Sequence, residues 1–508
     1  MQTSDDADPT SREPTLGPVA AGALVFGASA AVLVVELVAL RLVAPYLGLT
    51  LETSTLVIGV ALAAIATGAW AGGQAADTMP PQRALGPLLA VSGVAVAATP
   101  FLVRGAGEAG GAGTAMLTAM LAILVPGALL SAVPPMVTKL RLTDLAETGT
   151  VVGRLSGIGT VGAIAGTVLT GFVFVAALPV SAVLVGLGVL LVVAAVVVEL
   201  RVRGVRAAVL PAVLLVPGAL GAAFGPGQCD AETVYHCASV ETDAERPTGR
   251  LLVLDGLWHS YVDLEDPTHL EFEYVRAMAA VTDTAFPVDR ALTAYHLGGG
   301  GLTLPRYLAT VRPGTSSVVS EIDPGVVELD EERLGLVTGR HLEVRIEDAR
   351  LGLGRLDTDS RDLVVGDAFG GISVPWHLTT REAISEVARV VRPDGLYAAN
   401  LIDNGRLAFA RAEVATIRER FEHVAVAADP VTLARGPGAG GNIVVVASDA
   451  PLDLPALRTA LAERDLTWGV VDGATLDTWV DDARVLTDDH APVDQLLTPH
   501  ATPVLPPA

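Results

Sequence analysis

A long apolar block in the first half of the chain limits what this sequence can fold into. Charged side chains are scarce between Pro18 and Gly225, whereas Asp, Glu and Arg recur every few residues from Asp230 onward. With 508 residues, of which 51% are hydrophobic, the chain is too long for one domain and too apolar for an ordinary soluble enzyme. We therefore expect a membrane-embedded helical domain followed by a domain in water.

Hydropathy predicts about seven membrane-spanning helices, each long enough to cross a bilayer. They lie at 19–45, 53–73, 84–103, 113–137, 151–177, 180–200 and 207–223, within a transmembrane domain at 18–225. The preceding residues, 1–17, are mostly polar and predict a disordered tail. Because this tail lacks an Ala-x-Ala cleavage site, we interpret the first span as an anchor and not as a cleaved signal peptide.

The distribution of basic side chains predicts the orientation of these spans. Most of them fall on one side of the membrane, namely Arg12, Arg83, Lys139, Arg141, Arg154, Arg201, Arg203 and Arg206. The opposite side has Arg104, with Arg41 near the end of a span. Since Lys and Arg are enriched in cytoplasmic loops, we expect a multi-pass protein of the plasma membrane with its N-terminus inside. An odd number of spans then places the second domain outside the cytoplasm.

Two cysteines, Cys229 and Cys237, follow the last predicted span and are the only ones in the chain. Seven residues separate them, a gap that a disulfide can close in an oxidising compartment. Two inert thiols or a metal site are the alternatives. His236 is the only histidine nearby, and no fourth ligand completes a zinc set. We therefore expect a disulfide and no metal ion.

Polar and small residues inside the spans suggest local contacts. Glu36 lies well inside the first span, where an ionisable group is costly unless it is paired or faces a polar cavity. Arg41, five residues later, is a candidate partner. A structural polar contact and a path for a substrate or proton both remain open. In the fifth span, Gly162 and Gly166 form a small-xxx-small pair, which is typical of close helix packing.

Strand-like and helix-like segments alternate from Gly249 onward. Short strands at 250–254 and 260–263 predict a small β-subdomain, which a helix at 271–281 follows. Later strands are expected at 291–297, 317–322, 342–346, 362–366, 396–400 and 442–447, with a helix at 304–311. This alternation predicts a mainly parallel, doubly wound sheet of the Rossmann type. The expected boundaries are a disulfide-bearing linker at 226–248, the α/β domain at 249–495 and a tail at 496–508.

A glycine loop and an acidic residue predict a nucleoside site. The loop follows a strand and consists of Gly298, Gly299, Gly300 and Gly301. Such glycines let the backbone approach a ligand closely, and the next helix presents its amide groups there. About twenty residues later, Glu321 ends the next strand, where a carboxylate can accept both ribose hydroxyls. The formal net charge of −23 excludes nucleic acid as a partner and suits cationic small molecules, although solubility alone also accounts for it.

Several motifs together resemble the spermidine synthases, which are polyamine aminopropyltransferases. They are Leu254-Asp255-Gly256, Tyr274, the glycine loop, Glu321-Ile322-Asp323-Pro324, Glu347-Asp348-Ala349 and Gly366-Asp367-Ala368-Phe369. The resemblance spans about 249–450 and implies a class I methyltransferase-like fold. It also implies that the loop and Glu321 bind decarboxylated S-adenosylmethionine, that Asp348 contacts the adenine amino group, and that Asp367 assists deprotonation of the attacking amine.

The proposed catalytic pair, Asp367 and Tyr274, also makes chemical sense by itself. An ammonium group has no lone pair and must lose a proton before it attacks the carbon beside a sulfonium. A carboxylate and a tyrosine hydroxyl can hold and deprotonate it. A structural cap after a strand is the alternative role for Asp367.

The sequence departs from the family where the amine would bind. Gly301 stands where the loop usually carries an aspartate, and Asp367-Ala368-Phe369-Gly370 lacks the second carboxylate of the family's Asp-Ser-x-Asp. The usual Tyr-His-Glu is Tyr274-Val275-Arg276. His259 replaces the glutamine that normally follows Leu-Asp-Gly, which makes it a candidate ligand-binding residue.

The membrane block and the α/β domain together are similar to actinobacterial fused transporter-like spermidine synthases. The late segment Leu486-Thr487-Asp488-Asp489-His490-Ala491-Pro492 belongs to this resemblance, and its two aspartates suggest either an acidic pair over the site or a helix cap. The first functional hypothesis is a membrane-anchored transferase that moves aminopropyl from decarboxylated S-adenosylmethionine, a co-substrate, to a diamine such as putrescine. It needs no permanently bound cofactor.

Two other functions stay open. One is a sensor or transporter whose degenerate synthase domain binds polyamine or nucleoside without turnover, and the other is methyl transfer from S-adenosylmethionine itself. The expected partners are a polyamine, a nucleoside substrate and the lipid bilayer. The sequence leaves a homo-oligomer open.

Overall fold

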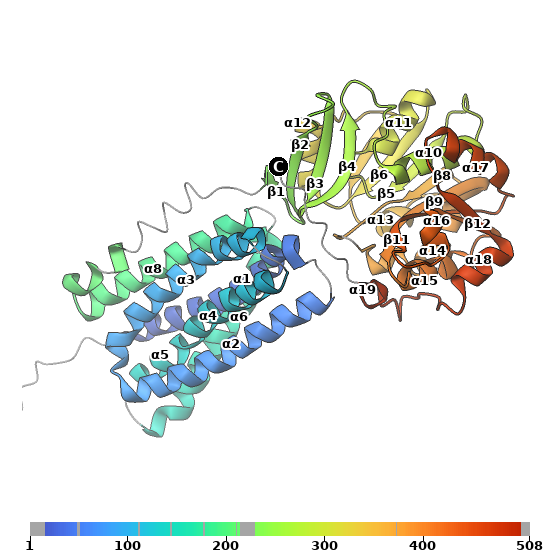
Figure 1. Cartoon of the computed structure of the whole chain (residues 1–508). Helices are drawn as coiled ribbons and strands as arrows, with labels where there is room; N and C mark the ends of the chain where they lie inside the picture. The colour runs from blue at the N-terminus through green and yellow to red at the C-terminus, as the bar shows by residue number, and fades with distance from the viewer. Residues whose placement is uncertain are drawn as a thin grey trace, which may run out of the picture. The chain divides into compact units, whose positions relative to one another are not determined.

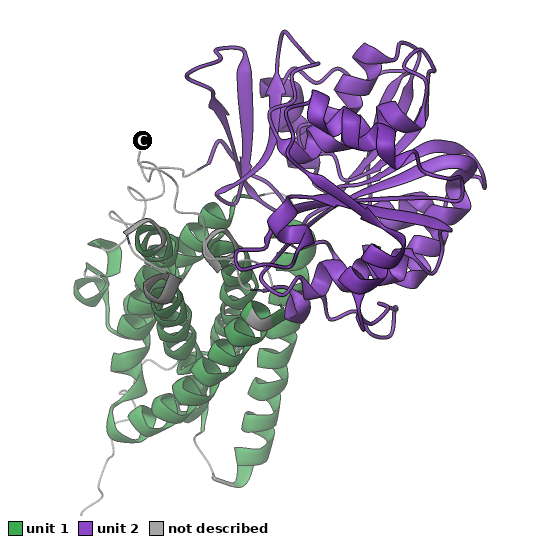
Figure 2. Ribbon diagram, turned by 45° about the vertical axis from the view of Figure 1, so that its right-hand side comes forward, with its two compact units in different colours: residues 1–228 green, residues 229–508 purple. Residues whose placement is uncertain are grey.

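The computed structural model describes residues 16–47, 51–109, 112–142, 145–175, 178–209, 211–213, 229–371 and 373–498. The chain divides into two compact units, Met1–Gln228 and Cys229–Ala508 (Figure 2). The first is helical and the second is α/β (Figure 1). Each unit is described by itself.

The helical unit consists of long apolar helices. Its elements are α1 (Pro18–Leu47), α2 (Leu51–Thr78), α3 (Pro81–Ala109), α4 (Ala112–Ser131), α5 (Val133–Arg141), η1 (Leu145–Glu147), α6 (Thr148–Leu169), η2 (Thr170–Phe174) and α8 (Val180–Val202). Within the described residues, six helical segments are long and apolar enough to cross a membrane, and they coincide with the first six predicted spans. The predicted seventh span, 207–223, falls largely outside the described residues.

Close packing of α1 against α6 follows from small residues. A Cβ atom added to Gly162 or Gly166 would collide with backbone atoms of Phe26 or Ala30 on α1. The structure therefore agrees with the small-xxx-small expectation for this helix pair. At the far end of α1, the Arg41 guanidinium donates a hydrogen bond of 3.4 Å to the carbonyl oxygen of Val175. Glu36, five residues earlier, is half-buried, and both of its expected roles remain predictions.

The α/β unit begins with a four-stranded antiparallel sheet in the order β1-β2-β3-β4. Its strands are β1 (Ala231–Glu232), β2 (Cys237–Thr242), β3 (Gly249–Leu254) and β4 (Leu257–Asp263). The last two coincide with the strands predicted at 250–254 and 260–263. Asp255 and Gly256 join them with φ values of 52° and 76°, as a tight hairpin turn requires. The segment expected to be a linker, 226–248, instead supplies β1 and β2, so the unit begins at Cys229 and not at Gly249.

The larger sheet has eight strands in the order β12-β10-β11-β9-β8-β5-β6-β7. Its strands are β5 (Thr293–Leu297), β6 (Ser316–Glu321), β7 (Leu342–Ile346), β8 (Arg361–Gly366), β9 (Val391–Asn404), β10 (His423–Ala428), β11 (Gly440–Ser448) and β12 (Gly469–Asp472). The five strands from β7 to β9 are parallel, as predicted. The pairs β9–β11, β11–β10 and β10–β12 are antiparallel, so the sheet is mixed.

Helices cover both faces of this sheet (Figure 1). One face packs against α10 (Glu273–Ala285), α11 (Thr303–Val311) and α17 (Leu454–Glu463). The opposite face packs against α13 (Ala349–Leu353), α14 (Arg381–Val390), α15 (Ala408–Ile417) and α18 (Gly473–Val480). The remaining helices are α12 (Pro324–Arg333), which packs beneath the small sheet, and η3 (Trp376–Leu378), α16 (Pro430–Leu433) and α19 (Val493–Leu496). Strands of this sheet bury alternate side chains in two cores, as a doubly covered sheet requires.

Candidate functional site

The glycine loop and Glu321 meet at the carboxyl ends of β5 and β6. Gly298 and Gly300 have φ values of 91° and 48°, which favour glycine. The backbone N–H of Gly299 donates a hydrogen bond of 2.9 Å to Oε2 of Glu321, and the N–H of Gly300 lies 3.4 Å from the same oxygen. The structure therefore brings together two features that the sequence separates by about twenty residues.

The other carboxylate oxygen of Glu321 is held by the start of α12. Oε1 accepts a hydrogen bond of 2.9 Å from the backbone N–H of Asp323. Asp323 is fully buried and caps α12, because its Oδ1 accepts from the N–H of Gly325 at 3.0 Å. Both oxygens of Glu321 are thus fixed by backbone donors, which orients the carboxylate at the end of the strand.

Asp367 follows β8 and lies one strand away from the glycine loop. Although part of its surface is accessible, desolvation raises its pKa to about 6, and hydrogen bonds from Asn400 and Tyr274 oppose this rise. Tyr274, on α10, has a pKa raised above its ordinary value by desolvation and by the charge of Asp367. The two predicted catalytic residues are therefore in contact, and Asp367 titrates near neutral pH.

A pair of asparagines supports Asp367 from the adjoining strands. Asn400 on β9 donates from Nδ2 to Oδ1 of Asp367 at 2.9 Å, and Asn442 on β11 donates to Oδ1 of Asn400 at 3.0 Å. The side chain of Asn400 is 2% exposed. Neither asparagine is among the site residues predicted from the sequence. The one available signal was a polar residue at the end of the buried strand predicted at 396–400.

Asp348 caps α13 and does not stand free beside the loop. Its Oδ1 accepts from the N–H groups of Arg350 and Leu351 at 2.9 and 3.1 Å, and its Oδ2 lies 2.8 Å from Nε2 of His377. Arg350 in turn forms two hydrogen bonds with Asp488, at 2.8 and 2.6 Å. Asp488 is therefore engaged in an ion pair that holds the start of α13.

His259 lies on β4, next to the residue that contacts the glycine loop. Its Nδ1 is 3.0 Å from the carbonyl oxygen of Leu257, and desolvation lowers its pKa, which favours the neutral ring. The neighbouring Ser260 accepts a hydrogen bond of 2.9 Å at Oγ from the N–H of Gly301. A Cβ atom on Gly301 would lie 2.9 Å from Cβ of Ser260 and 3.1 Å from Cγ2 of Val262. The small sheet therefore leaves no room for a side chain at position 301.

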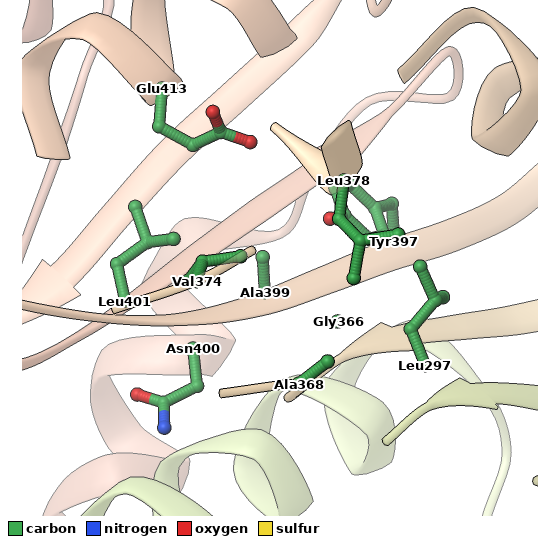
Figure 3. A pocket seen from close by; sticks show the side chains of 10 residues that line it. All are labelled: Leu297, Gly366, Ala368, Val374, Leu378, Tyr397, Ala399, Asn400, Leu401 and Glu413. Atoms are coloured by element: carbon green, nitrogen blue, oxygen red, sulfur yellow. The ribbon is translucent and has the colours of Figure 1, made fainter. Parts of the chain in front are cut away.

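A small cavity lies beside this site (Figure 3). It has a volume of about 20 Å³, which suits one water molecule. Its lining comes from β5, β8, β9, α15 and the residues around η3, namely Leu297, Gly366, Ala368, Val374, Leu378, Tyr397, Ala399, Asn400, Leu401 and Glu413. Glu413 is 2% exposed, and its Oε2 has no hydrogen-bond partner among the described residues.

The two cysteines form the predicted disulfide. Cys229 and Cys237 are bonded, with their Cα atoms 5.5 Å apart. Across the described part of the chain, no group of three or more His, Cys, Asp and Glu side chains is arranged to hold a metal ion.

A glycine loop, an acidic strand end and a mixed sheet covered on both faces define a class I methyltransferase-like protein in the C-terminal half. No family model matches the chain. It is 27% identical to a polyamine aminopropyltransferase of Vibrio vulnificus over 248 residues, which cover 46% of this chain and 79% of that protein. It is 26% identical to a probable polyamine aminopropyl transferase of Bifidobacterium longum over 282 residues, or 53% of this chain and 61% of that one.

Among solved structures, the chain is similar to a probable spermidine synthase from Corynebacterium glutamicum. The two are 30% identical, with 51% of this chain and 95% of that chain covered and a TM-score of 0.48. The C-terminal half of this chain belongs to the spermidine synthase family. These similarities cover only about half of the chain.

Proposed function

We propose that the α/β unit is an aminopropyltransferase, which moves the aminopropyl group of decarboxylated S-adenosylmethionine to a diamine such as putrescine. One observation carries the proposal. Asp367, with a pKa of about 6, contacts the Tyr274 hydroxyl and the Asn400 amide one strand away from the glycine loop. A carboxylate that is ionised at pH 7 but still basic is suited to general-base catalysis.

The donor nucleoside would lie over the glycine loop. Glu321, whose carboxylate is fixed by backbone N–H groups, would accept hydrogen bonds from the ribose hydroxyls. Asp348, which contacts His377, would accept a hydrogen bond from the adenine amino group. His259 has a lowered pKa and lies beside Ser260, which contacts the loop, so we expect it to form a hydrogen bond with the donor. The donor is a co-substrate, and no permanently bound cofactor is needed.

The transfer itself requires one deprotonation and one displacement. Asp367 accepts a proton from the ammonium group of the acceptor, and the Tyr274 hydroxyl orients the amine that results. The nitrogen lone pair attacks the methylene carbon beside the sulfonium, and a C–N bond forms as the C–S bond breaks. The bonding electron pair stays on sulfur, and neutral methylthioadenosine leaves. No covalent enzyme intermediate is required.

The residues that would bind the acceptor amine favour a second function. Position 301 has no room for the loop aspartate that the family usually carries, and Ala368-Phe369-Gly370 supplies no second carboxylate. A domain that binds nucleoside or polyamine without turnover, as a sensor or part of a transporter, is consistent with both features. Glu36 and Arg41 would then belong to a path through the helical unit, which we propose lies in the plasma membrane.

Product release by the purified full-length protein distinguishes the two functions. With decarboxylated S-adenosylmethionine and putrescine, the transferase hypothesis predicts methylthioadenosine that disappears in Asp367→Asn. Asp394→Asn, at an exposed aspartate that follows the α14 helix, is the matched control and should keep full activity. Binding of methylthioadenosine by calorimetry without any release from a panel of diamines would contradict transfer and favour the binding function.

A further inference from the structure

The loop that the disulfide closes, residues 229–237, packs against the turn that carries Glu321. The hydroxyl of Thr233 donates a hydrogen bond to Oδ2 of Asp323, and the backbone N–H of Tyr235 donates to the same oxygen at 3.2 Å. Thr233 is 9% exposed and Asp323 is fully buried. A buried carboxylate held by two donors of one loop is a strong local constraint, because hydrogen bonds to charged groups are the stronger ones.

Steric contact reinforces these hydrogen bonds. A Cβ atom added to Gly325, at the start of α12, would lie 2.7 Å from both Cβ and Cγ2 of Thr233. Position 325 therefore accepts only glycine while Thr233 occupies its place. The loop and the start of α12 fit together closely.

The loop is also rigid within itself and tied to the small sheet. The N–H of His236 donates to Oγ1 of Thr233 at 2.8 Å, and the N–H of Thr233 donates to the carbonyl oxygen of His236 at 2.8 Å. Nδ1 of His236 lies 2.8 Å from Oδ2 of Asp255, and the N–H of Cys237 donates to Oδ1 of the same aspartate at 2.9 Å. The loop is therefore held by its own hydrogen bonds, by Asp255 and by the disulfide.

His236 lies in this loop, close to His259 and to two carboxylates of the candidate nucleoside site. Burial lowers the pKa of His236, but the hydrogen bond and charge of Asp255, together with the charges of Asp323 and Glu321, raise it overall. The ring of His236 lies 6.2 Å from that of His259, measured between centroids. The loop thus contacts Asp323, two residues after the carboxylate that ends β6.

We infer that the disulfide-closed loop 229–237 positions Glu321 for the nucleoside, so that affinity for an adenine nucleoside depends on the Cys229–Cys237 bond. The chain of contacts runs from Thr233 to Asp323 and from the N–H of Asp323 to Oε1 of Glu321 at 2.9 Å. Opening the disulfide frees one end of the loop, and Thr233 then leaves Asp323 more often. The inference rests on the proposed role of Glu321 in nucleoside binding.

Calorimetric titration of the full-length protein in detergent with methylthioadenosine tests this inference. The oxidised protein is compared with the protein reduced by a phosphine, with Cys229→Ser/Cys237→Ser and with Thr233→Val. Thr459→Val, an exposed threonine on α17, is the matched control. We expect Kd to rise roughly three- to tenfold in each of the three altered forms, which is the range for one lost hydrogen bond, and to stay unchanged in the control.

The outcomes separate this inference from the proposed function. If the oxidised protein does not bind methylthioadenosine, the proposed nucleoside site itself is wrong. Suppose that the oxidised protein binds and that mass spectrometry confirms reduction of the disulfide. If Kd then changes by less than twofold both after reduction and in Thr233→Val, the loop does not position Glu321. Thr233→Val leaves the disulfide intact, so the test stands even if the double cysteine variant fails to fold.

Discussion

Asn400 donates a hydrogen bond of 2.9 Å to the carboxylate of Asp367, the residue proposed as the general base. This bond opposes the rise in pKa that desolvation causes. Removing it in Asn400→Leu should raise the pKa of Asp367 above about 6, and the acid limb of the rate profile should shift upward by about one pH unit or more. Activity should therefore fall most at pH 6 to 7 and recover toward pH 9, as measured by methylthioadenosine release across pH.

Asn442→Leu is the matched control for this shift. It removes the donor to Oδ1 of Asn400 at 3.0 Å but leaves the bond to Asp367 in place, so its shift should be smaller. A merely structural role for Asn400 would lower activity equally at all pH values. If the acid limb of the rate profile is unchanged in Asn400→Leu, then Asn400 does not set the pKa of Asp367.

Glu321→Gln tests the nucleoside end of the site. The amide keeps the shape of the side chain but loses the charge, and one of its two polar atoms becomes a donor facing the N–H groups of Gly299 or Asp323. We expect Kd for methylthioadenosine to rise by about tenfold or more, since hydrogen bonds to charged groups contribute about 1.5–3 kcal/mol. Glu328→Gln, an exposed position on α12, should bind normally. Equal affinities in the two variants would argue against a ribose site at Glu321.

Glu413 should make the stability of the folded protein depend on pH. Desolvation raises its pKa well above the ordinary value, so the folded protein holds the carboxyl protonated at a pH where the unfolded chain is ionised. Such a group contributes stability that is fully present below pH 4.5 and is lost as pH rises toward the folded pKa. Glu413→Gln removes this loss, so the Tm of the variant, relative to that of the wild type, should increase as pH rises above 4.5. A constant difference in Tm would contradict a protonated Glu413.

Asp488 should have the opposite pH dependence. Hydrogen bonds from Arg350 and Thr380 lower its pKa to about 2, so its contribution is present above pH 4 and is lost as pH falls through about 2. The side chain of Asp488 is 42% exposed, which limits the loss in Asp488→Asn to about 1 kcal/mol at pH 7. Thermal unfolding in high salt should reduce the difference from the wild type further, because screening weakens an exposed ion pair. A loss that persists in molar salt would point to packing and not to charge.

The sequence predicted the parts of the fold that have a local signal. Each strand predicted between 250 and 447 lies within or nearly within an observed one. Buried strands have runs of hydrophobic residues, and glycines mark the turns between them, so both signals are local in the sequence. β10 and β12 were not predicted, and neither was the antiparallel pairing of β11 with β9. β2 was assigned to a linker because Cys237–Thr242 is half polar, and its partner β3 follows only after a turn. Pairing of this kind depends on the partner strand and not on the segment itself.

The candidate site divides in the same way. The sequence predicted the glycine loop and Glu321, because a glycine loop about twenty residues before an acidic strand end is a recognisable pattern. The sequence did not predict three supporting residues, because their partners lie far away along the chain. Asn400 contacts Asp367, 33 residues away, and Thr233 contacts Asp323, 90 residues away. Asn442 contacts Asn400. An asparagine or a threonine has many local roles, and only the assembled sheet assigns it one.

The location of the α/β unit depends on the seventh span. Six spans, ending at Val202, would leave this unit on the side of the N-terminus, whereas a seventh at 207–223 would place it on the opposite side. The disulfide between Cys229 and Cys237 favours the second arrangement, because such bonds persist in oxidising compartments. Alkaline phosphatase fused after residue 228 should therefore be active, and a fluorescent protein fused there should be dark. Deleting 207–223 should reverse both results, and fusions that are unchanged by the deletion would show that this segment does not cross the membrane.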